Sequence, residues 1–362
     1  MERGAAAVYK REPGPPHERS ISEHPAVFRR PVAHSSSVAT FNTHRPMTLP
    51  EREPARKPRR RGLFLPWLLM ILVIVGWSIG WFWLRGEAVG RMDAGVAQLR
   101  KAGYDIAWRE RRVGGFPFRL DVTLQDARIA EPSGWAVSAD EVKAEAWIYR
   151  LDHWVAVLPR GLTLGRPEGG PVVVQAKALR ASLAGLDQRP PRLSVEGVDL
   201  TFTASPGAKP YPIETAEGLQ LHLRPGPNDQ GGVLFKLDRA KLRLTGLPER
   251  VAQGKPVTVT WDLVLARMAA FDGPSWREAA RNWDQAGGVV TVREASIRGG
   301  DALLTAEGGP LRVGDDGRLQ GELKAKLKDA DSGVQALGGT VVLRDGKATL
   351  GPLEIGPSPR VF

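Results

Sequence analysis

The residues best suited to chemistry are few in the region after residue 84. It holds two histidines, His153 and His222, which are 69 residues apart and match neither Glu-x-x-His nor His-x-x-x-His. Those spacings would place metal ligands on one face of a helix, so the sequence predicts no metal site. The residue types do not exclude a Ser–His–Asp triad, but the region lacks a Gly-x-Ser-x-Gly nucleophile elbow.

Other motifs in the same region favour structural roles. Asp140 and Glu141 would point to opposite faces of a strand, as a solvated pair. The segment 253–256 (Gln-Gly-Lys-Pro) is typical of a turn rather than a phosphate loop, and 315–317 (Asp-Asp-Gly) lacks the further carboxylates of a calcium loop. The chain has no cysteine, which excludes disulfides, thiol nucleophiles and Cys-ligated metals. We therefore predict no catalytic, cofactor-binding or metal residues, no cofactor, and a protein that is not an enzyme.

Positive charge is concentrated before the region that folds. Residues 1–62 hold 13 Lys/Arg against 6 Asp/Glu, whereas the remaining residues contribute only +4 of the net +11. The densest cluster, at positions 56–61, directly precedes an apolar run. This placement is typical of a membrane-orientation signal, so we expect no nucleic-acid partner.

The apolar run 63–84 contains no charged residue and would span about 33 Å as a helix, enough for a hydrocarbon core of about 30 Å. Trp67 lies near one end, and Trp77, Trp81 and Trp83 lie near the other, as in an aromatic belt. The preceding cations predict a cytoplasmic N-terminus and a periplasmic C-terminal domain at the inner (cytoplasmic) membrane. A signal peptide cleaved after 88–90 is the weaker alternative, because its apolar core would be shorter.

Residues 1–62 are expected to be a disordered basic cytoplasmic tail, because they show no apolar periodicity. Met47 could be the true initiating methionine, in which case residues 1–46 would not belong to the natural protein. After the anchor, Val89, Met92, Val96 and Leu99 form one helical stripe, which predicts an amphipathic linker helix over 86–102.

From residue 103 to 362 the period changes to two. Alternating apolar and polar residues predict about a dozen strands, for example 118–124, 193–202, 219–223 and 319–327. The absence of intervening helices predicts an antiparallel sheet, and the fold class is mainly β, with one short helix at 275–286. Alternation leaves a sandwich, a barrel and a curved open groove as alternatives.

Seven tryptophans lie outside the anchor, and their commonest role is packing in the core. They could instead line an apolar ligand site or touch the membrane interface. They are Trp108, Trp135, Trp147, Trp154, Trp261, Trp276 and Trp283.

The segment 114–119, Gly-Gly-Phe-Pro-Phe-Arg, follows the anchor and a Gly-Tyr pair. With the closing stretch 344–359, it resembles the bacterial family called domain of unknown function 2125, over about residues 66–360. Because Phe116 and Phe118 flank a proline, we expect a strand entry with both rings packed inward. The segments 306–313 and 316–323 are also similar to AsmA-like envelope proteins, which implies an elongated β-groove that handles lipid.

These observations predict a single-pass membrane protein whose periplasmic β domain binds or handles lipid in the cell envelope. The alternative is a non-enzymatic scaffold that docks an envelope protein through a sheet edge. The expected partners are therefore the membrane, with either a lipid or an envelope protein.

Overall fold

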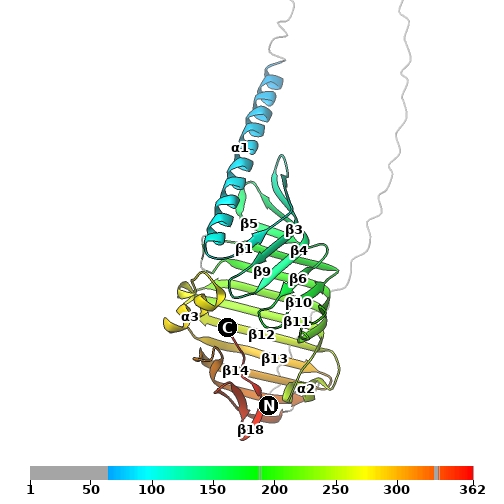
Figure 1. The fold of residues 1–362 in the computed structure, drawn as a ribbon, viewed down its shortest axis with the longest axis vertical. Helices are drawn as coiled ribbons and strands as arrows, with labels where there is room; N and C mark the ends of the chain where they lie inside the picture. The colour runs from blue at the N-terminus through cyan, green and yellow to red at the C-terminus, as the bar shows by residue number, and fades with distance from the viewer. Residues whose placement is uncertain (1–63, 187, 189, 330–332, 334, 362) are drawn as a thin grey trace, which may run out of the picture. The chain divides into compact units, whose positions relative to one another are not determined.

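The computed structural model describes residues 64–361, except 187, 189, 330–332 and 334. The predicted tail, the choice between Met1 and Met47, and the cationic cluster at 56–61 lie outside these residues. The described part contains three α-helices, a short 3₁₀ helix and one sheet of 18 strands (Figure 1). The prediction of a mainly β fold with an antiparallel sheet is confirmed.

The first helix, α1 (Leu65–Lys101), runs without interruption through both the apolar run and the predicted linker. Pro66 lies in its first turn, where backbone N–H groups have no acceptor within the helix, so the N–H that proline lacks costs no helical hydrogen bond. The helix ends at Lys101, two residues before Gly103, whose φ of +90° suits glycine, and Tyr104 N–H donates to the carbonyl of Leu99. Among the described residues, α1 is the one helix that is long and apolar enough to cross a membrane.

The strands follow the predicted alternation and are more numerous than predicted, because several short strands show too few alternations to be recognised from sequence. Their bounds are β1 Asp105–Ala107, β2 Glu110–Gly114, β3 Arg119–Ala130, β4 Ala136–Trp147, β5 Arg150–Val157, β6 Leu162–Gly165, β7 Val172–Gln175, β8 Ala178–Ala184, β9 Arg192–Ala204, β10 Ile213–Gly226, β11 Gln230–Leu242, β12 Val257–Ala266, β13 Val290–Gly299, β14 Ala302–Val313, β15 Leu319–Asp329, β16 Gln335–Arg344, β17 Lys347–Leu350 and β18 Leu353–Pro357.

All the pairings are antiparallel. β3 pairs with β1 and β2 on one side and with β4 on the other. β4 then pairs with β5 and β6, and these strands continue through β8 and β7 to β9. From β9 to β18, each strand pairs with the next in the chain. Positive φ at both Asp345 and Gly346 forms the predicted tight turn between β16 and β17.

Two hydrophobic clusters form the core. The first joins β7 and β9–β12 with α2 (Leu247–Ala252), and Val172, Leu237 and Val257 lie at its centre. The second joins β13–β17 with α3 (Trp276–Gln285), whose Trp283 is buried against the sheet. The predicted helix at 275–286 is confirmed: Ser275 caps α3 by accepting from the backbone N–H of Glu278. The 3₁₀ helix η2 (Met268–Ala270) leads into α3.

The expectation that Phe116 and Phe118 pack inward is wrong. Both lie in the turn between β2 and β3, and they are 52% and 56% exposed. The turn projects the two rings toward α1 instead of into the sheet, because Trp77 and Trp81 of α1 contact them from the side.

Candidate functional site

The structure does not bring the two histidines together. His153 lies on β5 and His222 on β10, and β8 and β9 lie between them, so the two strands are three strand spacings apart, about 14 Å. His222 Nδ1 is 2.9 Å from Ser194 Oγ on the neighbouring strand, a cross-strand polar pair. Within the described residues that imidazole has no other hydrogen-bond or ion-pair partner, so the pair lacks the acid that orients a catalytic histidine.

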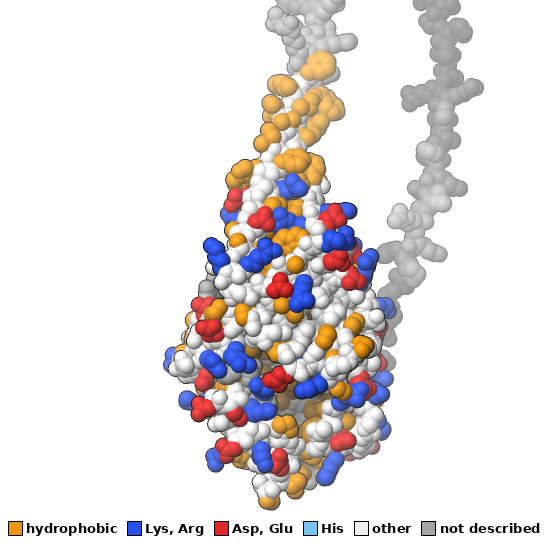
Figure 2. All heavy atoms as spheres, in the orientation of Figure 1, with side chains coloured by type: hydrophobic (Ala, Val, Ile, Leu, Met, Phe, Trp, Pro, Cys, Tyr) orange, Lys and Arg blue, Asp and Glu red, His pale blue; other side chains and the backbone are white. Residues whose placement is uncertain are grey.

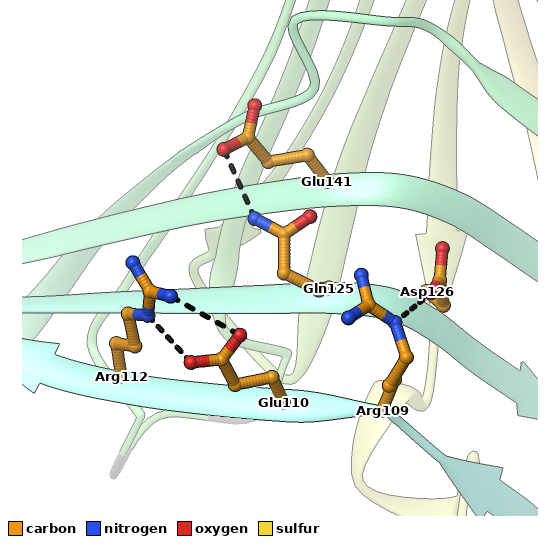
Figure 3. A network of polar contacts seen from close by, with 6 residues as sticks. All are labelled: Arg109, Glu110, Arg112, Gln125, Asp126 and Glu141. Carbon is orange, nitrogen blue, oxygen red and sulfur yellow. Dashed lines mark hydrogen bonds and ion pairs between the residues drawn. The ribbon is translucent and has the colours of Figure 1, made fainter.

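A network of polar contacts lies on and beside β2, β3 and β4 and consists of ion pairs and hydrogen bonds within β2 and between neighbouring strands (Figure 3). Arg112 Nε is 2.6 Å from Glu110 Oε1, and this hydrogen bond lowers the pKa of Glu110. Partial burial raises the pKa of Glu141, but bonds from Gln125 and Lys143 outweigh it and lower that pKa. Each carboxylate is therefore held ionised beside its partner, which suits a solvated sheet face and does not suit a general acid.

No group of three or more metal-ligating side chains occurs among residues 64–361 outside the gaps. The most distinctive concave surface is an apolar groove of about 510 Å³. It lies where the ends of β3, β4 and β6 meet the start of α3 and the end of the chain. The groove is lined by Tyr104, Ile129, Glu131, Trp135, Ala136, Val137, Leu164, Trp276 and Val361.

A second hollow, of about 360 Å³, adjoins the apolar groove and shares Trp135, Trp276 and Val361 with it. Its remaining lining is mostly polar, and we call it the cationic pocket. The other residues are Ser133, Arg166, Pro167, Glu168, Gly169, Lys209, Arg277 and Arg360. Four cations thus face one carboxylate in this pocket.

Trp276 holds the walls of both hollows together. Its backbone N–H donates to Glu131 Oε2 at 3.0 Å, and its indole Nε1–H donates to the carbonyl of Val361 at 2.7 Å. The end of the chain is fixed in turn to the start of β15, because Leu319 N–H donates to the Pro359 carbonyl and Val361 N–H to the Gly317 carbonyl. Residues from both ends of the sheet are therefore held at one site.

The four cations of the pocket are not equally available. Arg166 donates to the carbonyls of Gly169, Gly170 and Lys209 and lies over the ring of Tyr211, so its role is structural. Arg360 Nη1 is 3.6 Å from Glu168 Oε2. The side chains of Lys209 and Arg277 are exposed and form no ion pair within the described residues. These two cations can receive an anionic group.

Tyr104 adds a hydroxyl to the apolar groove. Burial raises the pKa of this phenol, and the nearby negative charge of Glu131 raises it further. The hydroxyl therefore stays protonated at neutral pH and can donate a hydrogen bond to a ligand.

The expectation that the seven tryptophans pack in the core is wrong for four of them. Trp283 is buried, with 2% exposed, but Trp135, Trp147, Trp261 and Trp276 are exposed. Two of these, Trp135 and Trp276, line the two hollows. From the sequence no site residue was predicted, and an apolar ligand site was only the alternative role of the tryptophans. A signal was present in the sequence: Trp135 follows Pro132-Ser133-Gly134, a turn that places it at a strand end.

The comparisons with known proteins give one result. A family model described as "Uncharacterized protein conserved in bacteria (DUF2125)" matches residues 81–341, which is well over half of the chain. No curated protein and no solved structure matches, so the similarity to AsmA-like envelope proteins stays a prediction. The chain belongs to this uncharacterised bacterial family, DUF2125.

Proposed function

We propose that this protein is anchored in the inner membrane by α1 and binds an anionic lipid with its periplasmic β domain. The observation that carries the proposal is the junction of the apolar groove with the cationic pocket across Trp135, Trp276 and Val361. A lipid has the same division, an apolar chain and a charged head group. The role proposed is binding or handling of lipid in the cell envelope, without catalysis.

The size and chemistry of the two hollows support this ligand. Their volumes, about 510 and 360 Å³, fall within the usual range of small-molecule sites. The larger hollow offers apolar side chains, with Tyr104 and Glu131 as its polar groups. Lys209 and Arg277 would pair with a phosphate or carboxylate at the mouth of the smaller one.

The test compares the full chain with two variants, each purified from a membrane in mild detergent. Val137→Lys puts an ammonium group in the apolar groove, whereas Val198→Lys changes an equally placed strand valine of β9 that lines neither hollow. The two valines are 37% and 45% exposed. Native mass spectrometry of the bound lipid should show loss for Val137→Lys alone. Equal lipid content in the two variants would contradict a lipid site in this groove, because lipid around α1 is common to both.

A second candidate function is a scaffold that binds a partner through a sheet edge. β18 pairs with β17 alone among the described strands, and its exposed Leu353 lines one hollow together with Leu337 of β16. An edge of this kind accepts an added strand. Gly246 approaches the Ile355 carbonyl so closely that a Cβ there would lie 2.5 Å from it, so the edge is partly covered. Proximity crosslinking from Leu353→Cys in cells should recover one envelope protein if this function holds, and none otherwise.

A further inference from the structure

One face of α1 is bound to the β domain along much of its length. Trp77 Nε1–H donates to the Pro117 carbonyl, and Trp81 Nε1–H donates to the Arg119 carbonyl, at 2.9 and 3.0 Å. Arg85 Nε–H donates to the Val113 carbonyl at 3.0 Å. The helix therefore fixes the turn between β2 and β3 beside its apolar half and does not act as a loose tether.

The contact with Trp77 determines how far this turn reaches along α1. Arg85 is the first charged residue after the apolar run, so it marks the end of the stretch that hydrocarbon can cover. Trp77 is eight residues earlier, which is about 12 Å along the helix axis. Pro117 is hydrogen-bonded to Trp77, so along the helix axis it lies nearer to the bilayer centre than Arg85 does.

The side chains carried to this depth are aromatic and uncovered. Phe116 and Phe118 remain more than half exposed although they contact Trp81 and Trp77, with ring centroids 5.4 and 5.9 Å apart. The turn between β4 and β5 lies beside them, because Ile148 N–H donates to the Phe118 carbonyl at 3.2 Å. That turn adds two exposed rings. We call the four rings the aromatic tip: Phe116, Phe118, Trp147 and Tyr149.

Four backbone carbonyls in and beside the turn accept hydrogen bonds from protein groups. The carbonyls of Gly115, Pro117, Phe118 and Arg119 accept from Arg119 N–H, Trp77 Nε1–H, Ile148 N–H and Trp81 Nε1–H. Pro117 has no N–H to satisfy. A turn in water would not need these partners, whereas irregular backbone in hydrocarbon does, since no water is present to hydrogen-bond it.

Charged residues begin just behind the tip. Arg119 Nη1 is 2.9 Å from Glu145 Oε2 on β4, and Arg119 also faces Asp121. Figure 2 shows the same division: hydrophobic side chains cover the free part of α1, and Lys, Arg, Asp and Glu side chains appear where the helix reaches the sheet. Arg119 is bonded to Trp81 and so lies about 6 Å past the level of Arg85, a distance that its long side chain can span toward the water.

We infer that the aromatic tip enters the lipid leaflet on the C-terminal side of α1 and seats the β domain on the membrane. The occupant of this apolar surface is lipid, because the surface is continuous with the apolar face of a helix that spans the bilayer. The inference rests on the proposed membrane anchor, and it does not depend on lipid binding in the apolar groove. It gives the family's Gly-Phe-Pro-Phe segment a physical role.

The absence of cysteine allows a direct test in the full chain. Single variants Phe116→Cys, Phe118→Cys and Tyr149→Cys are labelled with a nitroxide and reconstituted in vesicles of phosphatidylethanolamine and phosphatidylglycerol. Ile79→Cys on α1 reports the anchor, and Trp261→Cys on β12 reports a solvated site. Collision with oxygen, which concentrates in lipid, is compared with collision with a water-soluble nickel chelate.

At the three tip positions we expect oxygen accessibility to exceed nickel accessibility, as at Ile79→Cys, with the reverse at Trp261→Cys. Nickel accessibility at the tip equal to that at Trp261→Cys would overturn the inference while leaving the anchor in place. A tip label shielded from both reagents would also overturn it, because a second copy or another protein surface would then cover the rings. Tyr149→Cys lies outside the Phe-Pro-Phe turn, so it keeps the test valid where a phenylalanine variant fails to fold.

Discussion

The proposal of a lipid groove makes a quantitative prediction for Trp135→Ala. Trp135 is 43% exposed and lines both hollows, so a bound chain would cover much of its free indole surface. A large aromatic side chain offers up to about 250 Å², of which the exposed part is about 100 Å². At about 25 cal/mol per Å², covering it fully is worth about 2.5 kcal/mol, and incomplete cover reduces this to about 2 kcal/mol. We expect Trp135→Ala to weaken binding about 30-fold.

The assay titrates the full chain in detergent with a stearic acid that carries an anthroyloxy fluorophore. Trp261→Ala is the matched control, because Trp261 is 45% exposed but lines neither hollow and packs on Phe235. It should bind the probe as the unmodified protein does. Equal losses in the two variants would show that the probe binds exposed indoles in general, and unchanged affinity in Trp135→Ala would refute the groove as the site.

Three further predictions concern stability, each measured by thermal or denaturant unfolding followed by circular dichroism. Trp283→Ala should cost about 3–5 kcal/mol, because it empties a fully buried site in the second core cluster. Gly161→Ala should destabilise more than Gly254→Ala: both have positive φ, but a Cβ at Gly161 would lie 2.1 Å from a β7 carbonyl oxygen, whereas Gly254 has open space. The hydrogen bond from Lys241 lowers the pKa of Glu214 below its ordinary 4.5, so its stabilisation is present above pH 4.5 and is lost as pH falls through the lowered value. Glu214→Gln should therefore flatten the acid limb of the stability curve, and an unchanged limb would contradict this ion pair.

The parts of the fold that sequence could predict are those governed by local periodicity. Alternation over 193–202 and 319–327 identified β9 and β15, which contribute Leu200 and Ala325 to the two core clusters. Pro274-Ser275 and Gly287-Gly288 bounded α3 because capping and termination are local effects. Short strands such as β6 and β7 were not separable, because four residues give too few alternations to show a period.

The groove could not be predicted because its residues come from distant parts of the chain. Trp135 precedes β4, Trp276 begins α3, and Val361 lies at the end of the described residues. Periodicity says which side chains share a face, but it does not say which segment covers that face. The meeting of these three residues depends on how the whole sheet places its two ends, which no local pattern specifies.

The same limit explains the error over the aromatic residues, and it connects the two proposals. Tryptophan and phenylalanine are assigned to the core because burial stabilises them most, but burial against the chain itself is only one way of removing a ring from water. Here most of the uncovered rings of the β domain lie at two places, at the tip beside the apolar half of α1 and around the groove near Lys209 and Arg277, while Trp261 lies apart from both. Bilayer lipid would cover the first and a single bound lipid the second. Since Phe116 and Trp135 lie on separate surfaces, a variant at either one should leave the other function intact.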